Sequence, residues 1–195
     1  MAQSQPLLTL PARDEHDEDP NYAAPLRDIK GMFGMLPNML ARMVNLPGLL
    51  STYLAGYNAF RGSGLGPVEQ EVVLLTISRF NRCTYCVAAH SIGADMAKAP
   101  AELVEALRAG ATLPDARLDA LAVFTTVMLE RRGEPSRDEL ATFLAAGFAE
   151  PDVLAIVLAI AVKTISNYTN HLFSTPIDAV FAHRSWDAPG DDEPR

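Results

Sequence analysis

The chain of 195 residues is long enough for one domain with a substantial hydrophobic core. Apolar residues make up 49% and charged residues 21% of the sequence, which is typical of a soluble globular protein and excludes a disordered chain. The net charge of −8 argues against a nucleic-acid-binding surface, because phosphate recognition needs clustered lysine and arginine.

Two polar segments flank the predicted domain. Residues 1–22 are expected to form a flexible acidic tail, with five acidic residues just before Pro20. Residues 186–195 are interpreted as a second flexible tail, which leaves residues 23–185 as a single all-helical domain. No signal peptide opens the chain, and the longest apolar run, residues 153–162, is too short to cross a bilayer. We therefore expect a cytoplasmic protein without membrane contact.

Helical periodicity dominates the segment between the two tails, with no convincing alternating strand and no repeat. Prolines in first turns, glycines at helix ends and a capping box at Ser136 and Glu139 set the boundaries. The expected helices cover residues 25–34, 39–44, 47–61, 67–80, 83–98, 100–108, 114–132, 136–147 and 151–170. About eight or nine helices joined by short links predict an all-α bundle.

The two cysteines of the chain, Cys83 and Cys86, lie three residues apart at the start of the helix expected at 83–98. A disulfide between them would close almost no loop, so it would stabilise the fold little. Two close cysteines in a chain without an export signal serve chemistry or metal binding more often than structure.

His90 extends the cysteine pair along one helix face. Residues three, four and seven apart lie on the same side of a helix, so Cys83, Cys86 and His90 form one stripe. Cys86 and His90, one turn apart, are close enough to share a proton. Cys83 lies at the helix N-terminus, where free backbone amides and the helix dipole favour a thiolate. Such a dithiol suits a cycle of oxidation and re-reduction.

Two other interpretations of this stripe remain open. Cysteine is often buried, so the pair could fill the core, but this interpretation leaves His90 unexplained. The Cys-x2-Cys pair and His90 also supply three of the four ligands of a structural zinc site. No fourth ligand is near in the sequence, and only the fold could bring His171 or His183 to that site.

Glu71 lies where a polar helix start, residues 66–70, changes to the apolar run 72–77. That helix is apolar nearly all round, so we expect it to be buried on most sides. A carboxylate in apolar surroundings can have a raised pKa and can accept and donate a proton. An acidic residue near a helix start is equally well explained as a solvated side chain that the helix dipole favours.

Polar residues also share one face near the end of the last expected helix: Asn167, Asn170 and His171. Such residues usually form caps or hydrogen bonds, and the functional alternative is a lining of the active cavity or a subunit contact. An aromatic stripe at helical spacing is expected to belong to the core: Tyr53, Tyr57 and Phe60.

The combination of Glu71, eleven intervening residues and then Cys-x2-Cys-x3-His resembles a known motif. It is similar to the alkylhydroperoxidase D-like branch of the carboxymuconolactone decarboxylase superfamily. The likeness covers roughly residues 27–180. It rests on four further segments: residues 33–38, 73–78, 81–90 and 167–171.

The resemblance implies an all-helical antioxidant-type fold, assembled into trimers or hexamers. It also implies that Cys83 and Cys86 reduce hydroperoxides by cycling between dithiol and disulfide, with His90 and Glu71 as the proton relay. The residue before the second cysteine can be histidine in this family, whereas here it is Tyr85. Tyrosine titrates at about pH 10 and cannot shuttle protons as imidazole does near neutrality. We therefore expect weaker or different catalysis, with Tyr85 placed to order a water.

The leading prediction is a peroxidase in which a Cys86 thiolate attacks the peroxide and Cys83 condenses with the resulting sulfenic acid. The opposite order stays open, because the helix start favours Cys83 as the more acidic thiol. No cofactor motif is recognised, so the electrons are expected from an external dithiol such as a lipoyl or thioredoxin-like protein. The alternatives are a carboxymuconolactone decarboxylase-like lyase, which needs no dithiol, and a zinc-stabilised helical interaction module.

Overall fold

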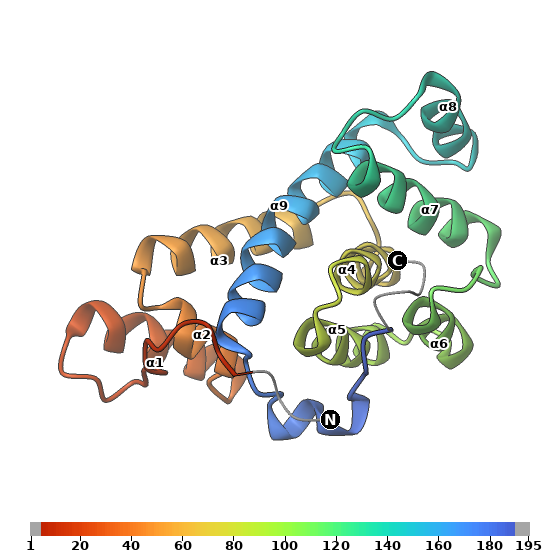
Figure 1. Cartoon of the computed structure of the whole chain (residues 1–195). Coiled ribbons are helices and arrows are strands. Elements are labelled where there is room, and N and C mark those ends of the chain that lie inside the picture. The colour runs from red at the N-terminus through yellow and green to blue at the C-terminus, as the bar shows by residue number, and fades with distance from the viewer. Residues whose placement is uncertain (1–4, 190–195) are drawn as a thin grey trace.

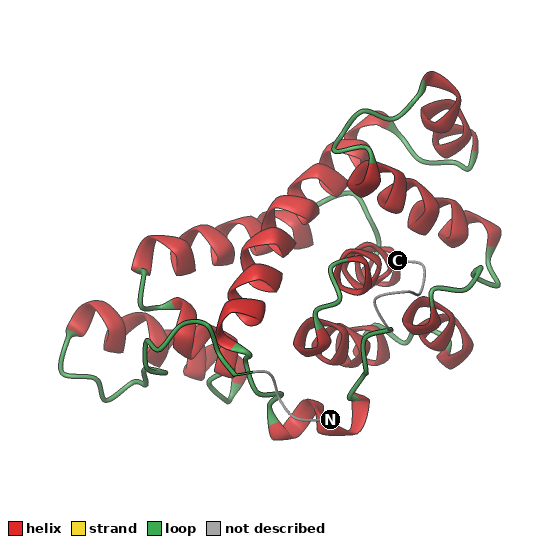
Figure 2. Ribbon diagram, viewed as in Figure 1, coloured by secondary structure: helices red, strands yellow, loops and turns green. Residues whose placement is uncertain are grey.

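The computed structural model describes residues 5–189, and this part of the chain is built from helices without a strand (Figures 1 and 2). The outermost residues of both predicted tails, 1–4 and 190–195, lie outside the described residues. The helices are α1 Pro20–Phe33, α2 Asn38–Met43, α3 Pro47–Arg61, α4 Pro67–Phe80, α5 Thr84–Met96, α6 Ala101–Ala109, α7 Ala116–Glu130, α8 Arg137–Ala145, α9 Glu150–Phe173 and the 3-10 helix η1 Ala179–Arg184. The predicted all-α bundle is confirmed.

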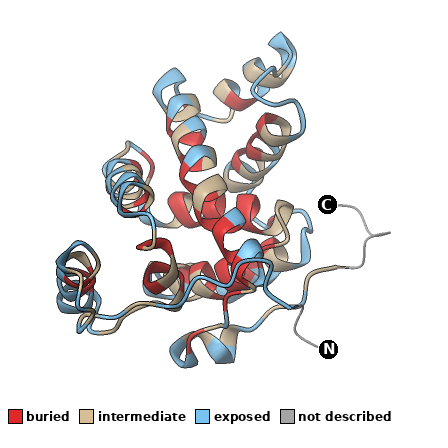
Figure 3. Ribbon diagram, turned by 60° about the vertical axis from the view of Figure 1, so that its left-hand side comes forward, coloured by how far each residue is buried: buried red, intermediate tan, exposed pale blue. Residues whose placement is uncertain are grey.

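Helices α4 and α5 lie at the centre of the molecule, with α3 and α9 on one side and α6 and α7 on the other (Figure 1). Every residue of α4 from Gln70 to Ser78 is buried, as expected for a helix that is apolar nearly all round. Figure 3 shows buried residues concentrated on these central helices. Arg82 has a left-handed backbone conformation (φ 56°), and this tight turn brings α5 back alongside α4.

Helix α9 packs against α2, α3, α4, α5 and α7 and forms one wall of the site described below. It is long and apolar enough to cross a membrane by length and composition, and 44% of its most apolar stretch is buried against the other helices. Lys163 and Asn170 lie on its buried face, whereas Leu154 and Val157 lie on its exposed face.

Two elements differ most from the prediction, and the other helix boundaries lie within three residues of the expected ones. Helix α1 begins at Pro20 rather than Pro25, because the Asp19 carboxylate accepts a hydrogen bond from the Asn21 amide at 2.8 Å and caps the helix. Pro20 suits the first turn of the helix. Pro25 lies inside the helix, where proline is usually disfavoured. The 3-10 helix Ala179–Arg184 was not predicted, and it packs against α5.

The described part of the predicted N-terminal tail makes backbone contacts with the helical body. The Leu7 amide donates to the Leu172 carbonyl at 2.9 Å, and the Arg13 amide donates to the Ala41 carbonyl at 2.7 Å. These bonds attach the segment before α1 to α9 and α2. The flexibility of both tails and the single-domain boundaries, residues 23–185, stay predictions.

Candidate active site

A pocket of about 510 Å³ lies beside α5, between α1–α3, α9 and η1. Its wall is mostly apolar and includes the side chains of Phe33, Met39, Tyr53, Tyr57, Met96 and Phe181. Cys86 lines this wall together with four polar side chains: Arg61, Glu71, His90 and Lys163. An apolar pocket with a few convergent polar groups is the usual form of a small-molecule site.

Both predicted cysteines lie at the start of α5 as free, buried thiols. Cys83 is the N-cap residue of the helix, and Cys86 lies in its first turn. The Nδ2 atom of Asn170 on α9 donates to Cys86 Sγ at 3.3 Å and lies 3.8 Å from Cys83 Sγ. The cysteine pair is therefore fixed between two helices, with an amide donor directed at both sulfur atoms.

The surroundings separate the pKa values of the two thiols. Burial raises the pKa of Cys83 well above its ordinary value, and the hydrogen bond to Cys86 raises it further. Burial also acts to raise the pKa of Cys86, but the Cys83 hydrogen bond, the Lys163 charge and His90 together hold it well below its ordinary value. These surroundings favour Cys86 as the more acidic thiol, in place of Cys83, which the helix-start argument favoured. The order in which the two cysteines react stays a prediction.

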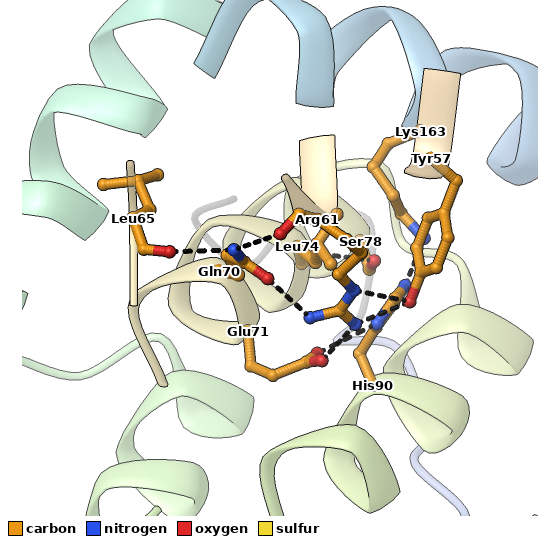
Figure 4. Close-up of polar contacts among 9 residues, drawn as sticks. All are labelled: Tyr57, Arg61, Leu65, Gln70, Glu71, Leu74, Ser78, His90 and Lys163. Carbon is orange, nitrogen blue, oxygen red and sulfur yellow. Dashed lines mark hydrogen bonds and ion pairs between the residues drawn. The ribbon is translucent and has the colours of Figure 1, made fainter. Parts of the chain in front are cut away.

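Glu71 of α4, His90 of α5 and Lys163 of α9 form a buried polar chain, and Figure 4 shows the side chains of Glu71 and Lys163 directed at the His90 imidazole. His90 Nδ1 lies 3.0 Å from Glu71 Oε2, and His90 Nε2 lies 2.9 Å from Lys163 Nζ. Burial and the Lys163 charge lower the pKa of His90. Because a carboxylate only accepts and an ammonium only donates, a neutral His90 protonated on Nδ1 satisfies both contacts.

The environment of Glu71 differs from the expected one. Burial alone would raise its pKa, but hydrogen bonds and charge from His90 and Arg61 hold the pKa below its ordinary value. Arg61 forms an ion pair with Glu71 and donates to the Tyr57 hydroxyl at 3.0 Å (Figure 4). Glu71 is thus buried as expected, but it is an ionised carboxylate held by Arg61 and His90 and not a carboxyl group in apolar surroundings.

Gly93 allows the Glu71 carboxylate to approach α5 closely. A Cβ atom at this position would lie 2.6 Å from Glu71 Oε1, well inside van der Waals contact. Because the carboxylate is held by Arg61 and His90, it cannot move without breaking one of these contacts.

Tyr85 does not face the cysteine sulfur atoms with its hydroxyl group. The phenol donates to Asp178 just before η1, and burial together with this aspartate raises the Tyr85 pKa far above its ordinary value. Asp178 also accepts from the Asn38 amide at 3.1 Å. The Tyr85 ring meets Phe181 edge-on at 6.1 Å and forms part of the pocket wall. The hydroxyl is therefore tied to a buried carboxylate instead of being placed to order a water.

Only one member of the predicted α9 stripe contacts the thiols. Asn170 does so, whereas Asn167 accepts from Asn81 Nδ2 at 2.9 Å and joins α9 to the turn before α5. His171 is exposed, with its ring 6.5 Å from that of Tyr168. Within residues 5–189, no group of three or more His, Cys, Asp or Glu side chains is placed to hold a metal ion.

Lys163 and Arg61 were not recognised from the sequence. Lys163 is 1% exposed, and it is the only Lys, Arg, Asp or Glu between Asp152 and the end of α9. A single lysine within such an apolar run is a signal that could have identified it, because lysine is almost never fully buried without a partner. Arg61 lies near a helix end, where arginine is common, so its sequence position carries no such signal.

The family predicted from the sequence is found by comparison with known proteins. Residues 47–126 match the model of the carboxymuconolactone decarboxylase family. This segment contains Glu71, both cysteines and His90, but it ends before Lys163 and Asn170. No curated protein matches the chain. The resemblance stated above is therefore confirmed over residues 47–126, which match the carboxymuconolactone decarboxylase family model.

Solved structures with the same fold cover nearly the whole chain. An uncharacterised peroxidase-related protein from Ralstonia eutropha, with an alkylhydroperoxidase AhpD core, has a TM-score of 0.78 at 18% identity and covers 91% of this chain and 96% of its own. A peroxidase-related protein from Silicibacter sp. has a TM-score of 0.75 at 23% identity, with 91% and 94% covered. A variant of the debrominase Bmp8, bound to 2,3,4-tribromopyrrole, has a TM-score of 0.71 at 17% identity, with 92% and 97% covered. At these identities the likeness establishes the fold.

Proposed function

We propose that this carboxymuconolactone decarboxylase family protein is a thiol-dependent peroxidase, a peroxidase-type oxidoreductase that reduces hydroperoxides with Cys83 and Cys86. One observation carries the proposal: the low-pKa thiol of Cys86 lines an apolar pocket beside a buried Lys163–His90–Glu71 chain, with a second thiol at hydrogen-bonding range. A stabilised thiolate with an adjacent resolving cysteine is the arrangement that peroxide reduction requires.

The first step oxidises Cys86. Its thiolate attacks the terminal oxygen of the hydroperoxide, the O–O bond breaks, and Cys86 becomes a sulfenic acid while the alkoxide leaves. The Lys163 ammonium lies in the same pocket wall and supplies the proton that converts the alkoxide to the alcohol. A cationic donor at the position where negative charge develops lowers the barrier by stabilising that charge.

The second step closes the disulfide. Cys83 Sγ attacks the oxidised sulfur of Cys86, the S–O bond breaks, and hydroxide leaves as water with the Cys83 proton. An external dithiol, of the lipoyl or thioredoxin-like type, then supplies two electrons and two protons. One proton returns to Cys83 and the other to Lys163, so Cys86 is regenerated as a thiolate.

His90 and Glu71 support this proton transfer. The ionised Glu71 fixes the proton of His90 on Nδ1, so that Nε2 accepts from Lys163 and holds the ammonium in place. Asn170 holds the Cys86 sulfur from the other side. Glu71 therefore orients His90 and balances the nearby positive charge of Lys163, whereas Lys163 is the proton donor.

A second candidate reaction uses the same residues. The pocket of about 510 Å³ has aromatic walls that suit a flat ring, and the Bmp8 debrominase has the same fold. A Cys86 thiolate that attacks a ring-bound halogen would form a sulfenyl halide, while the ring carbon takes a proton. Cys83 would then release the halide and close the same disulfide. Both reactions consume one dithiol for each substrate molecule.

The assembly and the location remain part of the proposal. Exposed apolar residues follow one face of α9 at helical spacing: Leu154, Val157, Ala161, Tyr168 and Leu172. We propose this face as a contact of a trimer or hexamer, because apolar side chains along one exposed stripe favour association. Light scattering of the purified protein measures the number of chains. We also propose a cytoplasmic location, where reducing dithiols are plentiful.

The function is tested by counting free thiols after one equivalent of an alkyl hydroperoxide is added to the purified, reduced protein. We expect the loss of two thiols per chain and their recovery with a dithiol, and no loss of two thiols in Cys86→Ser. A parallel sample with a brominated pyrrole tests the second reaction. Wild-type thiols that stay reduced with both substrates would favour the lyase-type chemistry of the family instead.

A further inference from the structure

The two cysteines open into different pockets. A second pocket, of about 530 Å³, is lined by Cys83 but not by Cys86, whereas the first pocket is lined by Cys86 but not by Cys83. The Tyr85 side chain lines both pockets and forms part of the partition. Because the phenol of Tyr85 is tied to Asp178, the partition is held in place.

The second pocket has a different chemistry from the first. It lies between the start of α5, the end of α9 and the C-terminal segment, and its lining includes Thr84, Asn170, His171, Thr175 and Trp186.

We propose that the second pocket is the entry site of the reductant: a slender dithiol reaches Cys83 there, while the oxidising substrate reaches Cys86 through the first pocket. The inference rests on the proposed function for the identity of the oxidant, but not for the two openings. It assigns separate faces of the protein to the two half-reactions.

The exchange reaction balances at Cys83. A thiolate of the incoming dithiol attacks Cys83 Sγ, a mixed disulfide forms, and the bond to Cys86 breaks with Cys86 leaving as a thiolate. The second thiol of the donor then attacks the donor sulfur of the mixed disulfide and closes the donor disulfide. Cys83 leaves and takes one of the two donor protons, and two electrons have passed from the donor to the protein.

The surroundings of the two sulfur atoms favour attack of the donor on Cys83, with Cys86 as the leaving group. The leaving sulfur in thiol–disulfide exchange departs faster when its pKa is lower, and Cys86 is the thiol whose pKa is held down by Lys163 and Asn170. Cys83 has the raised pKa, so it is the poorer leaving group and the better sulfur to keep in the mixed disulfide.

The burial of Cys83 restricts the shape of the donor. Cys83 is 1% exposed, so a donor thiol has to be carried into the pocket on a narrow chain. A free aliphatic dithiol or a dithiol on the flexible arm of a carrier protein fits this requirement. A thiol on the flat surface of a globular protein reaches Cys83 only if the pocket opens.

The two openings are tested by alkylation of single-cysteine chains, which requires no peroxide. Cys86→Ser leaves Cys83 for labelling, and Cys83→Ser leaves Cys86. We expect Thr84→Trp, at the second pocket, to slow labelling of Cys83 about tenfold and to leave Cys86 unchanged. Met96→Trp, at the first pocket, has the opposite effect. Glu102→Trp is the matched control, because Glu102 is an exposed residue of α6 that lines neither pocket. Equal effects of one tryptophan on both cysteines would overturn the inference.

The reductant route is tested on protein whose disulfide has been formed with a small-molecule thiol oxidant. We expect Thr84→Trp, and independently His171→Trp, to slow reduction by a free aliphatic dithiol and by the same dithiol on a carrier arm. Met96→Trp is expected to be reduced at the wild-type rate. Wild-type reduction rates in both second-pocket variants, or slowing with the carrier alone, would refute entry through the pocket. If peroxide fails to oxidise the protein but these results hold, only the proposed oxidant is wrong.

Discussion

Replacing Lys163 by methionine removes a buried ammonium while nearly keeping the volume of the side chain. Lys163 Nζ contacts His90 Nε2 at 2.9 Å, and its charge contributes to lowering the pKa of Cys86. An opposite charge within about 4–6 Å lowers a pKa by about 1–3 units. We therefore expect the Cys86 pKa to rise in Lys163→Met, because the variant loses one of the charges that hold it down.

The assay is the pH dependence of Cys86 alkylation, with the labelled site identified by peptide mass analysis. Wild-type Cys86 should react at a constant rate from neutral pH down to its low pKa, because only the thiolate reacts. In Lys163→Met the rate should fall at neutral pH and recover as the pH rises. Reduction of hydroperoxide should fall further than alkylation does, since the variant also loses the proposed proton donor.

The Cys86 pKa distinguishes this role from a structural one, because stability alone does not. Lys163→Met leaves the buried His90 Nε2 without its partner, so the variant should lose about 1–3 kcal/mol of unfolding free energy whatever the role of Lys163. Thr164→Ala is the matched control, because Thr164 is the next residue of α9 and its hydroxyl bonds only to its own helix, at Ile160. A destabilised Lys163→Met with an unchanged Cys86 pKa would refute the reasoning.

Three further predictions concern the rest of the site. Gly93→Ala should push the Glu71 carboxylate away from His90 and lower peroxide turnover about tenfold in steady-state assays, because the added Cβ would lie 2.6 Å from Oε1. Tyr85→Phe should cost about 1–3 kcal/mol in denaturant unfolding, since it leaves the buried Asp178 without one donor, yet it should leave the rate of Cys86 oxidation within about threefold. The pKa values of both His90 and Glu71 are lowered on folding, so the unfolded chain binds more protons as the pH falls. The free energy of unfolding should thus decline below about pH 6.5, and further below about pH 4.5, with the first decline absent in His90→Gln.

Each of these predictions has its own contrary result. Gly31→Ala is the control for the glycine substitution, because a Cβ there meets nothing within 4 Å. Wild-type turnover in Gly93→Ala would show that the carboxylate moves without consequence. A large loss of Cys86 reactivity in Tyr85→Phe would show that the Tyr85 hydroxyl takes part in the proton relay. A decline in stability near pH 6 that persists in His90→Gln would come from other groups.

Local spacing was sufficient to predict the parts of the site that belong to one helical hairpin. Cys83, Cys86 and His90 share a stripe because a helix repeats every 3.6 residues, and Glu71 lies on the preceding helix, which packs directly against α5. The sign of the Glu71 pKa shift could not be predicted in the same way. It depends on Arg61, which reaches the carboxylate from a different helix.

The missed features depend on contacts between distant segments. Lys163 lies 73 residues from His90 in the sequence, and Asp178 lies 93 residues from Tyr85. No local pattern links such pairs, since only the packing of α9 and the position of η1 bring them together. The start of α1 differs for a simpler reason: Pro25 is typical of a first helical turn, whereas Asp19, six residues before it, caps the helix.

The order of the cysteines is the central claim, and trapping the first oxidation product tests it most directly. One equivalent of an alkyl hydroperoxide is added to Cys83→Ser, and the sulfenic acid is captured with a selective reagent and located by mass spectrometry. The account predicts rapid capture on Cys86 in this variant, and slow or no oxidation of Cys83 in Cys86→Ser. Rapid sulfenic acid formation on Cys83, with Cys86 unreactive, would contradict it.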